Sequence, residues 1–240
     1  IVDIIIQVDE NFIKSNGLRK GLMTLSDFST VQNLTKNNQI SSTISGGSVA
    51  NSIVCLSQNK IKSAFIGKVS NDDLGEIFIQ GLIKEKVFFA NTMQENELKT
   101  GRCVIMVTED AQRTMSTYLG VSQKLNETDI NENIIINAQI IYLEGYLWDL
   151  ENAQNALKKA IKYAKQNNTK VAFSVSDVFC IERFRDSFLN LIINDVDIIF
   201  ANEEEVKSLF QDDNFDNILN KIKSMGKVFA LTRGEHGATI

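Results

Sequence analysis

The chain has 240 residues, of which 43% are hydrophobic and 23% are charged, with a formal net charge of -5 and three cysteines. This acidic balance argues against nucleic acid as the main partner, because phosphate backbones are bound by clustered Lys and Arg side chains. The cysteines have neither zinc-ligand spacing nor the pattern of a disulfide framework, which favours a reduced, cytoplasmic protein.

The first segment, Ile1 to Ile6, is an apolar run that contains one acid, Asp3. The run is far too short to span a membrane, and we predict a buried strand. A carboxylate in such a run is costly unless it is hydrogen-bonded or lies where the strand opens into a cleft. Asp3 is therefore a candidate ligand-binding residue, and the alternative is an outward-facing strand residue.

Two adjacent glycines, Gly46 and Gly47, precede a predicted helix that begins near Ser48. Glycine has no Cβ atom and tolerates positive φ, so a ligand can approach the main chain closely. The first N–H groups of the helix and the amide of Asn51 would then face that ligand. The alternative is an ordinary helix N-terminus with Asn51 in solvent.

Apolar, β-rich runs alternate with amphipathic stretches over much of the chain. The runs are 61–69, 138–143 and 171–175, and the amphipathic stretches are 74–86 and 152–166. This alternation predicts βαβ units around a mostly parallel sheet, and the length fits one domain.

Two regions, residues 4–40 and 98–119, break the alternation. The second is predicted to be a β-hairpin, with strand patterns on either side of Thr108 to Ala111. Arg113 follows this turn, and two interpretations are open: it reaches over a bound ligand, or it pairs at the surface with Glu109 or Asp110.

Polar residues follow two further apolar strands near the end of the chain. Asn202 and Glu205 follow the run 196–200, and Thr232, Arg233 and Gly234 follow the run 228–231. Ligands gather at the carboxyl ends of strands in open α/β sheets, so both groups are candidate site residues. For Asn202 and Glu205 the alternative is helix capping. The chain has neither a G-x-x-x-x-G-K-[ST] loop nor a G-x-G-x-x-G motif after its first strand, which disfavours P-loop kinases and dinucleotide enzymes.

Six segments, in order along the chain, resemble a known family. The first joins Gly46-Gly47-Ser48-Val49-Ala50-Asn51 to Phe65-Ile66-Gly67-Lys68-Val69-Ser70-Asn71-Asp72-Asp73-Leu74-Gly75, and the others are 101–120, 142–146, 176–180, 200–205 and 231–238. They resemble the PfkB-type carbohydrate kinases, the family of ribokinase and adenosine kinase, whose first pattern reads roughly GG-x-x-x-N, then F-I-G-x-V-G-x-D-x-x-G. Ser70 departs from this pattern, because the family has glycine there.

The resemblance implies a ribokinase-like α/β fold, with a mostly parallel central sheet flanked by helices and a small projecting β-sheet as a lid. It implies a single domain over residues 1–240 that is incomplete at both ends, with lid strands within about 4–40 and 98–119. The implied ligands are ATP and Mg²⁺. The residues implied to bind substrate are Asp3, Gly46, Gly47, Asn51 and Arg113, and those implied to bind the nucleotide are Asn202, Glu205, Thr232, Arg233 and Gly234, with Glu205 acting on magnesium through water.

The catalytic base of the resembling family lies in a D-T-x-G-A-G-D motif, which is absent from these 240 residues. The base is therefore expected beyond Ile240, and no residue here is assigned to it. We expect a phosphotransferase that moves the γ-phosphoryl group of ATP to a hydroxymethyl group of a nucleoside, most simply adenosine. The alternatives are a kinase of a free sugar such as ribose or fructose, or a noncatalytic nucleoside- or sugar-binding relative if the chain truly ends at Ile240. A monomer or homodimer without nucleic-acid or membrane partners is expected.

Overall fold

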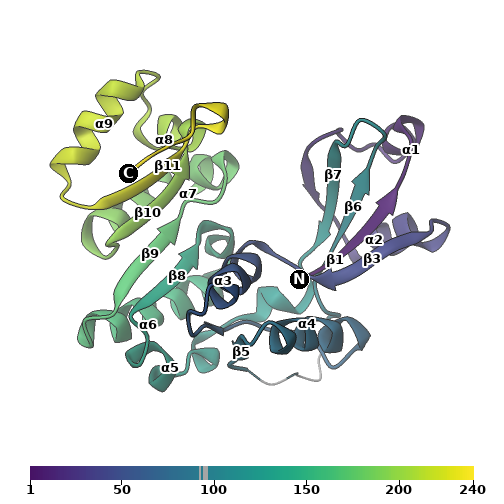
Figure 1. The fold of residues 1–240 in the computed structure, drawn as a ribbon, viewed down its shortest axis with the longest axis horizontal. Helices are drawn as coiled ribbons and strands as arrows, with labels where there is room; N and C mark the ends of the chain where they lie inside the picture. The colour runs from purple at the N-terminus through teal and green to yellow at the C-terminus, as the bar shows by residue number, and fades with distance from the viewer. Residues whose placement is uncertain (92, 94–96) are drawn as a thin grey trace. The chain divides into compact units, whose positions relative to one another are not determined.

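The computed structural model describes residues 1–91, 93 and 97–240. The chain divides into two compact units, Ile1–Leu125 and Asn126–Ile240, and each is described by itself. Figure 1 shows the course of the chain through its helices and strands.

The first unit contains a five-stranded sheet with the order β2-β7-β6-β1-β3. Its strands are β1 (Val2–Gln7), β2 (Met23–Leu25), β3 (Ile40–Ser45), β6 (Arg102–Val107) and β7 (Arg113–Tyr118). Strands β6 and β7 pair in antiparallel fashion, which confirms the predicted hairpin, while β1 runs parallel to β6 and antiparallel to β3. That this sheet acts as a lid stays a prediction.

Two helices that the sequence interpretation missed pack on one face of this sheet: α1 (Glu10–Ser15) and α2 (Phe28–Lys36). Asp9 and Asp27 cap them by accepting hydrogen bonds from the N–H groups of Phe12 and Thr30. Their apolar residues join those of β1 and β6 in one buried cluster, which consists of Ile6, Ile13, Val31, Leu34, Val104 and Met106. The sheet is therefore covered on this face by its own helices.

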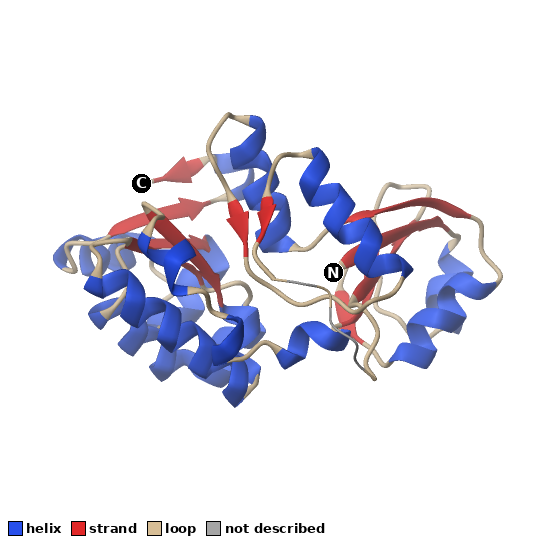
Figure 2. Cartoon of the chain, turned by 90° about the horizontal axis from the view of Figure 1, so that it is seen from below, coloured by secondary structure: helices blue, strands red, loops and turns tan. Residues whose placement is uncertain are grey.

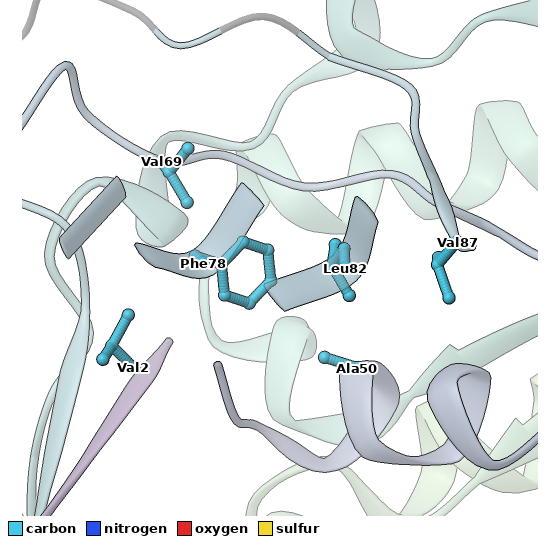
Figure 3. Packing of buried hydrophobic residues seen from close by; sticks show 6 residues of the cluster. All are labelled: Val2, Ala50, Val69, Phe78, Leu82 and Val87. Carbon is cyan, nitrogen blue, oxygen red and sulfur yellow. The ribbon is translucent and has the colours of Figure 1, made fainter. Parts of the chain in front are cut away.

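The remainder of the first unit is built on two longer helices, α3 (Ser48–Gln58) and α4 (Asp73–Lys84). Between and after them the chain forms a parallel pair of short strands, β4 (Ala64–Phe65) and β5 (Phe88–Phe89). The strand predicted over 61–69 is thus only two residues long. Figure 3 shows the cluster that joins these elements to the start of β1, namely Val2, Ala50, Val69, Phe78, Leu82 and Val87.

The second unit is built on the sheet order β12-β11-β10-β9-β8. The strands β8 (Ile140–Glu144), β9 (Lys170–Ser174), β10 (Ile198–Asn202) and β11 (Val228–Thr232) are parallel, and only β12 (Ala238–Thr239) is antiparallel. The mostly parallel sheet expected from the sequence is therefore confirmed. Its helices are α5 (Glu132–Ile136), α6 (Glu151–Gln166), α7 (Val178–Asn194), α8 (Glu203–Phe210) and α9 (Phe215–Ser224).

Helices and strands of the second unit form separate layers, with helices gathered along one side of the strands in Figure 2. Helix α6 shows how the sequence dictates this, since its apolar positions recur at intervals of three and four residues and all are buried. Those positions are Ala153, Ala156, Leu157, Ala160, Ile161 and Ala164. Within the described part of the chain, no helix is both long and apolar enough to cross a bilayer.

Candidate functional site

The candidate site residues fall into two groups, one in each unit. In the first unit Asp3 lies on β1, where Val2 and Ile4 are buried and Asp3 is only half-buried. Side chains alternate along a strand, so Asp3 lies on the face of the sheet opposite to the core cluster of α1 and α2. It is neither fully exposed nor part of the core, which is the position expected of a carboxylate that meets a ligand.

Asp3 lies against the glycine pair that follows β3. Strands β1 and β3 pair Asp3 with Ile44, and a Cβ atom at Gly46 would lie 2.1 Å from Asp3 Oδ2. Gly47 has a φ of 98°, a conformation that side chains other than glycine rarely adopt. The predicted glycine turn therefore exists, and it lets the backbone reach the carboxylate.

The predicted helix begins at Ser48, as expected, and presents Asn51 in its first turn. The Asn51 N–H donates to the Gly47 carbonyl at 2.9 Å, and the Asn51 side chain is exposed. No hydrogen bond from another described residue reaches the Asp3 carboxylate, and burial raises its pKa. Asp3, Gly46, Gly47 and Asn51 thus form a connected group with unused acceptor and donor atoms.

Arg113 begins β7, and its side chain is exposed. The surface ion pair considered for it with Asp110 does not form, because Asp110 Oδ2 lies 2.7 Å from Lys20 Nζ. Among the described residues the guanidinium of Arg113 has no partner. It is available to a ligand, although its contact with one remains a prediction.

Replacing Arg113 with alanine is expected to weaken acceptor binding about fivefold, the effect of one modest hydrogen bond, without changing the unfolding midpoint. The measurement is calorimetric titration of the acceptor, together with urea denaturation. Arg19→Ala, an equally exposed arginine of the same unit, is the control. Unchanged affinity in the Arg113 variant would place this side chain at the surface with no ligand contact.

In the second unit, Asn202 ends β10 and caps helix α8. The Asn202 N–H donates to Glu205 Oε2 at 2.8 Å, its Nδ2 donates to Oε1 at 2.9 Å, and the Glu205 N–H donates to Asn202 Oδ1 at 2.8 Å. This reciprocal arrangement is a capping box. The predicted capping role of Asn202 and Glu205 is thus confirmed. This role does not exclude a further one for the Glu205 carboxylate.

Glu205 is a buried carboxylate, with 8% of its surface exposed. Burial raises its pKa, the hydrogen bond from Asn202 opposes that rise, and nearby Asp177 adds to it. The proximity of two acids, Glu205 and Asp177, favours a positive ion at this position.

Thr232 lies beside Asn202, because the two residues are register partners at the carboxyl ends of β11 and β10. Gly234 follows with a φ of 56° and opens the turn. The Arg233 guanidinium is already engaged, since Nε donates to Glu203 Oε2 at 2.9 Å and the group lies 4.3 Å from the centre of the Phe215 ring. The two predicted nucleotide-binding segments are thus adjacent and joined by the Arg233–Glu203 ion pair.

Magnesium, which the resembling family implies, can be tested against this donor set. Both Glu205 oxygens already accept hydrogen bonds from Asn202, and no group of three or more His, Cys, Asp or Glu side chains within the described residues could hold a metal ion. Mg²⁺ usually keeps several waters and is held by one or two carboxylates and by substrate phosphates. The residues fit an indirect role in which Glu205 would orient bound water.

Two acids that the sequence interpretation did not assign lie at the same strand ends. Glu144 ends β8, is 5% exposed and accepts a hydrogen bond from the Tyr142 hydroxyl at 3.3 Å. Glu203 begins α8 and holds Arg233. The available signal was their position immediately at or after an apolar strand, which is the same signal that singled out Asn202.

The fold is α/β; the second group lies at the carboxyl ends of parallel strands, and the first lies around the start of β1 and the end of β3. Residues 22–240 match the model of the pfkB family of carbohydrate kinases, and the chain belongs to this family.

Two solved structures are similar over nearly the whole chain. Adenosine kinase from Sinorhizobium meliloti is 35% identical with a TM-score of 0.91, over 99% of this chain and 73% of that chain. A probable sugar kinase protein from Rhizobium etli CFN 42 has the same identity and TM-score, over 99% and 72%. A 5-dehydro-2-deoxygluconokinase of Clostridium perfringens is 28% identical over 208 residues, which are 81% of this chain and 61% of that protein. The chain thus spans less than two thirds of the length of this curated relative.

Proposed function

We propose that the protein is an ATP-dependent kinase that phosphorylates a hydroxymethyl group of a nucleoside, with adenosine as the first candidate. The observation that supports it best is the Asp3 carboxylate beside Gly46, which accepts no hydrogen bond from another described residue. A carboxylate accepts hydrogen bonds from hydroxyl groups, and paired ribose hydroxyls offer two such donors. Gly46 leaves room for this carboxylate against the backbone, because a Cβ atom there would lie 2.1 Å from Asp3 Oδ2.

The sheet face that Asp3 shares favours a nucleoside over a free sugar. Ile5, Ile105 and Met115 are register partners on the same face as Asp3, and all three are half-buried. Small-molecule sites combine apolar walls with a few placed polar groups. An apolar surface beside a hydroxyl acceptor suits a flat base attached to a ribose.

The residues of the chain then have distinct roles. Asp3 and Asn51 hold and orient the acceptor hydroxyls, while the Gly46–Gly47 backbone admits the sugar. Asn202, Glu205, Thr232 and Gly234 would lie at the phosphates, and a magnesium ion held there would supply positive charge for phosphoryl transfer. Because transfer depends mostly on positioning and charge stabilisation, these groups account for much of the task, and no residue here is assigned as the base.

A free sugar is the second candidate acceptor, because the probable sugar kinase from Rhizobium etli is as similar to this chain as the adenosine kinase from Sinorhizobium meliloti. The first test is ADP formation by the full-length protein with adenosine, other nucleosides, ribose or fructose, each with magnesium and with EDTA. Magnesium-dependent turnover of adenosine supports the proposal, and turnover of a sugar alone moves the acceptor to a sugar. Ligand binding without any turnover would show that the proposed activity is wrong.

A further inference from the structure

A buried hydrogen-bonded cluster joins the N-terminus of α4 to the segment that leads into β6. Asp72 Oδ1 accepts from the Gly75 N–H and caps the helix, and Asp72 Oδ2 accepts from the Thr100 N–H, both at 2.9 Å. The Thr100 hydroxyl in turn accepts from the Ser70 N–H at 3.0 Å, and the Ser70 hydroxyl donates to the Leu98 carbonyl. Thr100 and Ser70 are almost fully buried, so these internal hydrogen bonds take the place of hydrogen bonds to water.

The backbone around this cluster has little freedom to shift. A Cβ atom at Gly75 would lie 2.0 Å from the Ser70 carbonyl oxygen, so the first turn of α4 is in direct contact with the preceding loop. A Cβ atom at Gly101 would lie 2.5 Å from the carbonyl oxygen of Leu119, on the other side of the β6 entry. The segment 98–101 is therefore held between α4 and the end of β7.

The same segment sets the start of β1. The Gly101 carbonyl accepts from the Val2 N–H at 2.9 Å, and the next residue of β1, Asp3, is the register partner of Cys103. The connection runs from Asp72 to Thr100, through one peptide to Gly101, and across to Val2 beside Asp3. Asp72 lies on a different element from Asp3 and uses its carboxylate within this cluster.

Ser70 belongs to this cluster and is also the residue that departs from the family pattern in the first motif. A glycine at position 70 would keep the backbone N–H that donates to Thr100, but it would lack the hydroxyl that donates to Leu98. The serine therefore adds a contact to the segment 98–101 that the glycine form of the motif cannot make.

We propose that Asp72 is a positioning residue for acceptor binding: through Thr100 and Gly101 it fixes the start of β1 and thereby the Asp3 carboxylate. The inference rests on the proposed function, in which Asp3 meets the acceptor hydroxyls. An aspartate is required because a carboxylate is an acceptor at both oxygens. The oxygen of an asparagine at position 72 would keep the cap at Gly75, but its NH2 group would face the Thr100 N–H, so that two donors would oppose each other.

The test compares Asp72→Asn with Asp73→Asn in the full-length protein. The two aspartates are adjacent, but Asp73 is exposed and has no hydrogen-bonded partner among the described residues, so the second variant controls for the lost charge. Calorimetric titration gives the Kd for adenosine and for ATP without any need for turnover. Hydrogen–deuterium exchange follows the peptides that cover residues 1–7 and 98–106.

Asp72→Asn is expected to raise the Kd for adenosine about tenfold and to speed exchange in both peptides, with the Kd for ATP unchanged. Asp73→Asn is expected to change none of these. Faster exchange with an unchanged adenosine Kd, or an equal loss for ATP, would overturn the positioning role and leave a structural cap. If the wild-type protein binds adenosine but has no kinase activity, the kinase proposal fails. The adenosine Kd values of the variants still decide whether Asp72 positions Asp3.

A second pair of variants applies if Asp72→Asn does not fold. Thr100→Val removes the hydroxyl that accepts from the Ser70 N–H and interacts with Asp72, but it keeps the Thr100 N–H that donates to Asp72, and Thr100→Ser restores the hydroxyl. The valine variant is expected to weaken adenosine binding with unchanged ATP binding, and the serine variant is expected to recover it. Equal adenosine affinity in the two variants would overturn the connection from this cluster to Asp3.

Discussion

Replacement of Asp3 by alanine is expected to weaken acceptor binding about 100-fold and to leave ATP binding nearly unchanged. Hydrogen bonds to a charged group contribute about 1.5–3 kcal/mol, so loss of one or two contacts from ribose hydroxyls gives an effect of this size. The half-buried position of Asp3 leaves little water to replace the lost acceptor. The measurement is the Kd of the full-length protein for adenosine and for ATP.

Asp3→Asn separates charge from shape in this prediction. Asparagine keeps one acceptor oxygen, so its adenosine affinity should lie between those of the wild type and the alanine variant. Equal losses of adenosine and ATP binding would contradict the placement of Asp3 in the acceptor site.

The raised pKa of Asp3 sets the sign of two pH effects. Burial raises the pKa of this carboxyl, so ionisation of Asp3 destabilises the folded protein. This loss of stability is present above the raised pKa and disappears as the pH falls through that pKa. The asparagine variant should therefore be at least as stable as the wild type at neutral pH. Adenosine affinity should fall with the same protonation, because the protonated acid is a weaker acceptor.

Long periodic elements of the fold could be predicted from the sequence, and short ones could not. Helix α6 has 16 residues and repeats its apolar spacing over several turns, which makes its buried face evident. Helix α1 has only six residues, so its single buried side chain, Ile13, establishes no period. The usable signals for α1 and α2 were their capping residues, Asp9 and Asp27, and these also occur in ordinary turns.

The sequence allowed the residues of the candidate site to be named, but it did not show which of them contact one another. Asp3 and Gly46 meet because β1 and β3 pair in a defined register, and a one-residue slip would place Asp3 on the opposite face. The Asp72–Thr100 contact spans 28 residues of sequence, and the Arg233–Glu203 contact spans 30. Such contacts depend on tertiary packing, so sequence alone could not show that Arg233 is already paired.

Glu205→Gln is expected to lower kcat about 10- to 100-fold and to raise the magnesium concentration needed for half-maximal activity. Outer-sphere groups around a metal typically have effects of this size, and the glutamine removes the negative charge that would orient the bound water. The unfolding midpoint in urea should fall only modestly, because glutamine keeps one acceptor oxygen for the Asn202 N–H but loses the acceptor for Asn202 Nδ2. Steady-state kinetics at varied magnesium and urea denaturation test the two parts.

The side chain of Glu204 provides the matched control, because it is adjacent on α8 and 75% exposed. Glu204→Gln removes the same charge from the same helix turn, yet it should leave kcat and the magnesium requirement unchanged. Burial and Asp177 raise the pKa of Glu205, so its neutralisation offsets part of the lost hydrogen bond, and the urea midpoint shows whether a kinetic loss comes from unfolding. Wild-type kinetics in the Glu205 variant would remove this carboxylate from the phosphate site and leave it the capping role alone.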